Sequence, residues 1–268
     1  MTRSGAPSRT LVPVTRSPVQ PRTIARLLAA VLAGFAIVEA VLIYQQITTN
    51  TGGWYIGMDY DFYRGVGARW LADGSYYWPH QLAGPYDVRL MVDVLYPPTA
   101  LVLFVPLVFL PAVVWWLVPA GIIGYALYRW RPGPFAICGM LLLLMWPRAM
   151  GAIFHGNTDM WVAAGVAGAL LWGWPAAIVA LKPTFLPLAL LGIRRRAWWV
   201  AAGLGVVSII PMLGLWLDYV TAMRNLHIGW EYSLGSIPIA VLPLVGWLGR
   251  SHRERLGRVP DTQEVERG

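Results

Sequence analysis

Residues 54–98 read WYIGMDYDFYRGVGARWLADGSYYWPHQLAGPYDVRLMVDVLYPP, the longest polar interruption in an otherwise strongly apolar chain. The stretch is rich in aromatic rings, and acidic side chains outnumber basic ones. Its charged residues are Asp59, Asp61, Asp73, Asp87 and Asp93 with Arg64, Arg69 and Arg89. A connector between membrane helices needs only a few polar residues, and loops held on a rigid scaffold often carry function. We therefore predict that this stretch is a functional surface framed by apolar helices.

The composition of the 268-residue chain is typical of a helical membrane protein. Hydrophobic residues make up 57%, charged residues only 13%, and the mean hydropathy is +0.55. Soluble domains carry about 25% charged residues. The 15 tryptophans and 21 prolines also fit, because aromatic rings gather at bilayer interfaces and proline is commoner in membrane helices. We predict an all-α, polytopic membrane bundle of about six to eight transmembrane or re-entrant helices.

The net charge of +8 does not indicate a nucleic-acid partner. The arginines occur in clusters beside apolar runs, which positive-inside membrane topology explains better than a nucleic-acid-binding face. The single cysteine, Cys138, lies in an apolar run, so we expect neither a disulfide framework nor a thiol metal site. The four histidines lack metal-ligand spacing. No metal and no cofactor are therefore predicted.

The chain divides into one membrane domain and two tails. Residues 1–24 are predicted to be a disordered cytoplasmic tail, 25–249 a membrane domain with an outer loop at 48–95, and 250–268 a second cytoplasmic tail. The first apolar run, 27–47, is long enough to cross a bilayer and too long for the core of a signal peptide. Arginines before it favour a multi-pass protein of the plasma (inner) membrane with both termini cytoplasmic.

Two apolar segments are interrupted by proline. Residues 99–128 exceed one crossing, so they form either one long kinked helix or a hairpin that turns near Pro111. Residues 176–193 are divided at Lys182 and predict a broken or re-entrant helix, which is tolerated only inside protein or beside a watery cavity. Three further segments complete the predicted bundle: a crossing at 197–217, an outer loop at 218–232 and a returning helix at 233–249.

Lys182 is the only lysine of the chain and lies at this break, beside Pro183. A charge at membrane depth costs at least about 2.5 kcal/mol, so we expect it to have a partner. An ammonium beside exposed backbone donors suits a phosphate. The alternative to a phosphate-binding role is that the side chain of Lys182 extends along the apolar surface and places its ammonium at the membrane interface.

Asp59 and Asp61 lie near the start of the outer loop, just after the first predicted span. One interpretation is that they are solvated, or cap a helix that begins near Tyr63. The other is a carboxylate site among aromatic rings, which suit the apolar faces of sugars.

Four motifs, in order, resemble glycosyltransferase family 87, the polyprenol-phosphate-mannose-dependent mannosyltransferases with the GT-C fold. The first is Asp59, Tyr63, Gly65, Gly67, Leu71, Gly74 and Tyr77. The second is Tyr96-Pro97-Pro98 before Pro106-Leu107 and Leu110-Pro111. The third is Gly156-Asn157-Thr158-Asp159, and the fourth is Lys182-Pro183 with the arginine run before Trp198. The resemblance covers residues 25 to 230, and the chain lacks several C-terminal helices typical of the family.

The resemblance implies transfer of a hexose, mannose in the family, from a polyprenyl-phosphate donor to a lipid or glycan acceptor at the extracytoplasmic face, with inversion. It implies Asp59 as the general base, with Asp61 in reserve. The candidates for binding the donor phosphate are Lys182, Arg148, His155 and Arg224. The candidates for binding the acceptor or the sugar are Tyr63, Tyr96, Asn157 and Asp159. The alternative functions are a transporter or lipid-binding membrane protein, or a truncated, catalytically silent family member.

Overall fold

The computed structural model describes residues 20–49, 53–227 and 235–250, and within them every regular element is a helix. The tails were predicted at 1–24 and 250–268, and residues 1–19 and 251–268 of them lie outside the described residues. Helix α1 (Pro21–Thr49) begins earlier than expected, so residues 21–24, predicted as part of the tail, are helical. Proline is favoured at the first helical position because its missing N–H has no partner there in any case.

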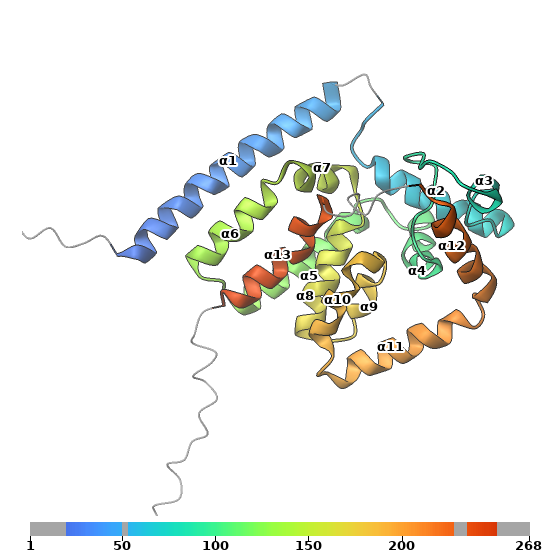
Figure 1. The fold of residues 1–268 in the computed structure, drawn as a ribbon. Coiled ribbons are helices and arrows are strands. Elements are labelled where there is room, and N and C mark those ends of the chain that lie inside the picture. The colour runs from blue at the N-terminus through green and yellow to red at the C-terminus, as the bar shows by residue number, and fades with distance from the viewer. Residues whose placement is uncertain (1–19, 50–52, 228–234, 251–268) are drawn as a thin grey trace, which may run out of the picture.

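Helix α1 is long and apolar enough to cross a membrane. Its 29 residues extend roughly 43 Å, against about 30 Å for a hydrocarbon core. It packs against α6 (Pro134–Leu144), and most of its large apolar side chains, such as Leu27, Phe35 and Leu42, are exposed. Figure 1 shows α1 lying along one side of the bundle. Such a surface is stable in lipid rather than in water.

The centre of the bundle is α8 (Asp159–Leu171), which packs against α5 (Val114–Trp130) and α13 (Ile237–Leu248). Every α8 residue from Trp161 to Ala169 is buried. Small residues allow neighbouring backbones to approach closely. A Cβ at Gly168, for example, would lie 2.6 Å from the ring of Pro175.

Three segments are bent or broken. Helix α7 (Pro147–His155) turns 72° from α6 at a proline. The predicted break in 176–193 is confirmed: the segment contains α9 (Ala176–Val179), η3 (Pro183–Phe185), α10 (Leu186–Ala189) and η4 (Leu190–Gly192). Helix α11 (Arg196–Ile209) turns 89° into α12 (Leu213–Asn225).

One of the predicted segment boundaries is wrong. A crossing over 197–217 followed by a loop from 218 was predicted, but the chain bends before Leu213 and Asp218 lies within α12. The reason is Pro211, which has no N–H to continue the helical hydrogen bonds of α11. Of the two alternatives for 99–128, the break near Pro111 is correct, although its first arm is short. That arm consists of η1 (Pro98–Ala100), α4 (Leu101–Phe104) and η2 (Pro106–Val108).

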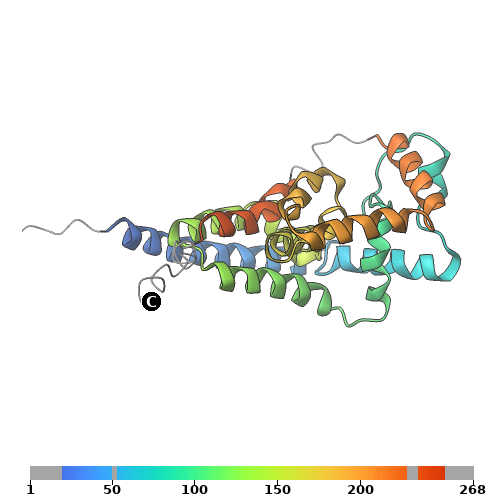
Figure 2. The same ribbon diagram turned by 90° about the horizontal axis from the view of Figure 1, so that it is seen from below.

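The region predicted as an outer loop is a folded layer built on α2 (Met58–Asp73) and α3 (Pro79–Ala83). Figures 1 and 2 place it at the end of the bundle opposite the start of α1 and the end of α13. Its aromatic rings mostly form a core; Tyr63, for instance, is buried and stacks on Phe104 with ring centroids 4.7 Å apart. Most of these rings are therefore unavailable as an open platform for sugar.

Some aspartates of this layer have structural partners. Buried Asp93 contacts His80 Nε2 at 2.7 Å and accepts a hydrogen bond from the backbone N–H of Arg89 at 2.7 Å. Asp73 accepts a hydrogen bond from the N–H of Ser75 at the end of α2. Asp73 and Asp93 thus stabilise turns within the layer. Asp59 is buried like Asp93, but it lies on the side of the layer that faces the bundle.

We expect Gly67→Ala to destabilise the protein by about 1–3 kcal/mol, the cost of overpacking a well-packed site. A Cβ at Gly67 would lie 2.5 Å from the carbonyl oxygen of Phe104, where α2 crosses α4. The measurement is the midpoint of thermal unfolding in detergent. Gly65→Ala is the control, because Gly65 is exposed on the same helix with no atom within 4 Å of its Cβ position. Equal midpoints for the two variants would contradict the close crossing.

Candidate functional site

The candidate site is a hydrogen-bonded network at the N-terminus of α8. Helix α7 ends at His155, and Gly156 turns the chain with φ 75°, a conformation that favours glycine. A Cβ at Gly156 would also lie 2.8 Å from the indole of Trp116. This turn directs Asn157, Thr158 and Asp159 into the space between α2 and the broken segment that contains Lys182.

Asn157 connects Asp59 to Lys182. Its Nδ2 donates to Asp59 Oδ2 at 2.6 Å, while its Oδ1 accepts from Lys182 Nζ at 3.0 Å and from the backbone N–H of Asp159 at 3.3 Å. An ammonium can only donate and a carboxylate can only accept, so the amide has one orientation that satisfies both neighbours. Asp59 and Lys182, which are far apart in sequence, thus share one network.

Lys182 is paired inside the protein. Its ammonium forms an ion pair with Asp159 and lies 3.4 Å from Ser236 Oγ. Ser236 in turn donates to Asp159 Oδ2 at 2.8 Å. The partner expected for Lys182 is therefore Asp159, and the charge of Lys182 is largely neutralised without any ligand. Sequence reasoning missed Ser236, because its position before Ile237-Pro238 is typical of an ordinary helix cap.

A second chain of hydroxyl groups joins the network at Thr158. Tyr63 and Tyr96 hydroxyls are 2.8 Å apart, and Tyr96 is 2.9 Å from Thr158 Oγ1. Burial raises the pKa of both phenols, so they stay neutral and act as hydrogen-bond donors and acceptors. These two tyrosines, predicted to bind acceptor or sugar, are brought to the site and connect α2 with α8.

Asp59 lies in the first turn of α2 and is only 5% exposed. Burial raises the pKa of its carboxyl group above the usual value, and the hydrogen bond from Asn157 partly opposes that shift. Its Oδ1 accepts no hydrogen bond from the described part of the chain. The result is a carboxylate with one oxygen held in place and a raised affinity for protons, which is what a general base near neutral pH requires.

The other predicted site residues lie at different distances from the network. Arg148 is exposed on α7, with its guanidinium against the backbone of Gly235, next to Ser236. His155 lies on the side of α7 that faces α1 and interacts electrostatically with Asp59. Asp61 is exposed on α2, near the hydroxyl of Tyr55. Arg224 is exposed on α12, with no contact to the network within the described residues.

We expect Asn157→Leu to raise the pKa of Asp59 further, because it removes the hydrogen bond that favours the charged carboxylate. The measurement is an NMR titration of selectively labelled aspartate. Since the folded-state pKa already exceeds the unfolded value, stability is lost as pH rises through it, and the variant should lose more stability over a wider pH range. Thr158→Val, which leaves Asn157 in place, is the control. An unchanged or lower Asp59 pKa in Asn157→Leu would contradict the assignment.

Among the described residues, no group of three or more His, Cys, Asp or Glu side chains is placed to hold a metal ion. Comparison of the chain with known proteins finds no matching family model, curated protein or solved structure. The likeness to glycosyltransferase family 87 therefore rests on the motifs in the sequence and stays a prediction.

Proposed function

We propose that the protein is an integral membrane glycosyltransferase that moves a hexose, mannose by family resemblance, from a polyprenyl-phosphate donor to a lipid or glycan acceptor. The observation that supports the proposal best is the buried carboxylate of Asp59, held through Asn157 and with one oxygen uncommitted. Structural carboxylates in the same layer, such as Asp93, instead have both oxygens engaged.

In the proposed reaction Asp59 acts as general base. It takes the proton of the acceptor hydroxyl while that oxygen attacks the anomeric carbon of the donor sugar. The bond between the anomeric carbon and the phosphate oxygen breaks, and its electron pair leaves with the phosphate. Displacement from the opposite side inverts the anomeric configuration. A second catalytic carboxylate, as in glycoside hydrolysis, is not needed.

The leaving phosphate needs positive charge or hydrogen-bond donors. Of the predicted candidates, Arg148 and His155 lie on α7 beside the network, and Lys182 lies within it but is paired with Asp159. We therefore assign the phosphate to the α7 side of the site, with Lys182 acting on Asp59 through Asn157. Arg224 has no contact with the network among the described residues, so we give it no part in this role.

We also propose a multi-pass topology with the α2 layer outside the cell and both termini in the cytoplasm. In support, α1 runs toward this layer, while α5 and α13 run away from it (Figures 1 and 2). Arg131 lies beside the end of α13, where Pro132 pairs with Arg250. Arginines at the end away from the α2 layer agree with the positive-inside rule.

The test is sugar transfer by the purified complete chain in lipid vesicles that contain radiolabelled polyprenyl-phosphate mannose or glucose and a membrane lipid extract as acceptor. The expected result is radiolabel in a new glycosidic product. Movement of the donor across the vesicle membrane without a new product would favour a carrier instead. No transfer from any lipid-linked hexose would contradict the proposal.

A further inference from the structure

Helix α1 carries one charged side chain in the middle of its apolar run. Glu39 is the only charged residue of the run 27–47 and lies two residues past its centre, about 3 Å along the helix axis. The side chain is half-buried, and among the described residues it makes neither a hydrogen bond nor an ion pair. Carboxylates at mid-bilayer depth are costly and pair with another polar group. Glu39 therefore needs a partner that the described fold does not supply.

Glu39 belongs to a row of side chains along one side of α1, which we call the α1 seam. Its six members are alternately four and three residues apart, the heptad spacing with which two helices pack along their length. They are Leu28, Leu32, Phe35, Glu39, Leu42 and Gln46. The buried residues of α1, which are Ala25, Ala36 and Ile47, form a different row, and the main neighbour of α1 is α6. The contact with α6 thus leaves the α1 seam available.

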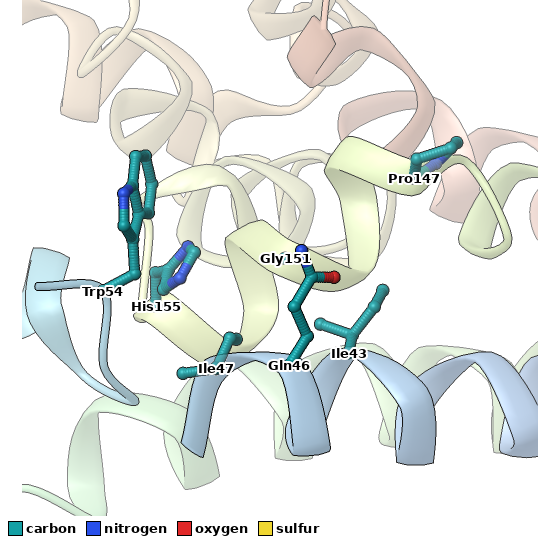
Figure 3. Close-up of a pocket in the computed structure, with 7 residues that line it drawn as sticks. All are labelled: Ile43, Gln46, Ile47, Trp54, Pro147, Gly151 and His155. Carbon is teal, nitrogen blue, oxygen red and sulfur yellow. The ribbon is translucent and has the colours of Figure 1, made fainter. Parts of the chain in front are cut away.

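The α1 seam is accessible in the described structure. Leu28, Phe35 and Leu42 are each at least half exposed, and Gln46 is exposed as well. At its last turn the seam reaches a hollow of about 280 Å³ between α1 and α7, which turns 72° from α6. Figure 3 shows the Gln46 side chain rising from α1 into this hollow. The seam therefore presents an unoccupied surface along its length.

The occupant that fits this surface is the same helix of a second copy. Copies of one chain insert into a bilayer in the same orientation. A two-fold axis that relates them is then perpendicular to the membrane, and each residue lies at the same depth in both copies. Glu39 near this axis faces its own counterpart. A protonated carboxyl group donates through its O–H and accepts through its other oxygen, so the two side chains can satisfy each other.

The other candidates for this surface do not supply a hydrogen bond at that depth. The hydrocarbon chains of lipids have no donor or acceptor. The two tails outside the described residues, 1–19 and 251–268, contain several charged residues and are unsuited to the bilayer interior. In contrast, hydrogen bonds between polar side chains stabilise the association of membrane helices. A single polar residue at a heptad position also specifies register and oligomeric state.

We propose that the protein forms a parallel homodimer through the α1 seam, with the Glu39 side chains of the two copies hydrogen-bonded to each other. The Gln46 amides form a second polar pair at the end of the seam, and the leucine and phenylalanine side chains pack between the helices. The dimer depends on α1 crossing the bilayer and does not depend on sugar transfer at Asp59.

Association is measured by Förster energy transfer between donor- and acceptor-labelled copies of the complete chain in lipid vesicles, over a series of protein-to-lipid ratios. We expect Glu39→Leu to dimerise about 5- to 30-fold more weakly than wild type, because it loses the interhelical hydrogen bonds. Glu39→Gln should keep most of the affinity, since an amide both donates and accepts. Both variants should unfold at the wild-type temperature in detergent, because Glu39 has no bond to lose within one described chain.

Disulfide cross-linking in the same vesicles locates the interface. Cys138→Ala removes the single native thiol and provides the background. Leu42→Cys lies on the α1 seam, and Ile37→Cys is the matched control on the opposite side of the helix. The two wild-type side chains are similarly exposed, at 58% and 65%. Oxidation should join two copies through Leu42→Cys and leave Ile37→Cys monomeric.

Several results would overturn the dimer. These are a wild type that stays monomeric at every protein density, a Glu39→Leu variant that associates as tightly as wild type, and cross-linking through Ile37→Cys in place of Leu42→Cys. The dimer and the enzyme also fail separately. Association that is lost in Glu39→Leu, without sugar transfer by wild type, supports the dimer and contradicts the enzyme. Sugar transfer by a wild type that remains monomeric contradicts the dimer and supports the enzyme.

Discussion

Asp59→Asn is expected to lower the rate of sugar transfer by about 10²- to 10⁴-fold, the usual contribution of a general base. The amide has the shape of the carboxylate and can still accept the hydrogen bond from Asn157, so the network should keep its geometry. It cannot take up the proton of the acceptor hydroxyl. The measurement is initial rate in the vesicle assay, at matched protein and donor concentrations.

The control for this variant is Asp61→Asn, on the same helix but exposed. It should retain nearly the full rate, and both variants should unfold at the wild-type temperature. Because burial raises the pKa of Asp59, removing its charge should not destabilise the fold. A normal rate in Asp59→Asn, or loss of the rate only in Asp61→Asn, would refute the assignment of the base.

Lys182→Met is expected to destabilise the protein by about 3–5 kcal/mol, because removing one member of a buried ion pair leaves the other charge uncompensated. The side chain of Asp159 is 5% exposed and that of Lys182 17%, so water cannot replace the lost partner. Ser236 would be the remaining side-chain donor to Asp159 in the described network. Thermal and denaturant unfolding in detergent provide the measurement.

The double variant Lys182→Met with Asp159→Asn is the matched control. It removes both charges and should regain most of the lost stability, which simple loss of packing at position 182 would not allow. If the single and double variants are equally unstable, the pair is not the source of the effect. If neither is destabilised, Lys182 is not buried with Asp159 in the native protein.

The sequence predicted the features that depend on local pattern. Composition alone predicts a helical membrane protein, and Lys182-Pro183 marks the break within 176–193 that the structure contains. The sequence did not predict the bend before α12. The apolar run continues through Pro211, and its length was taken as evidence of one crossing although proline can break a helix. The aromatic residues of 54–98 were taken as an open surface, but ring content does not distinguish a core from a platform.

The partners in the site could be predicted only in part. That Lys182 needed a counter-charge followed from its position, but Asp59 and Asp159 were equally available in sequence. Contacts over such separations depend on how α7 and α8 turn at Gly156, which local propensity does not specify. Ser236 carried no signal of its own, since it lies 77 residues from the carboxylate it contacts.

The amide of Asn157 has a further consequence as an electrically neutral spacer. Without it, the carboxylate of Asp59 and the ammonium of Lys182 would be free to collapse into a direct salt bridge, and an anion locked to a cation is a poor proton acceptor. With the spacer in place, each charge has a different neighbour: Lys182 is matched by Asp159, and Asp59 by a donor that carries no charge. The protein can therefore bury both opposite charges while the carboxylate of Asp59 keeps its affinity for a proton.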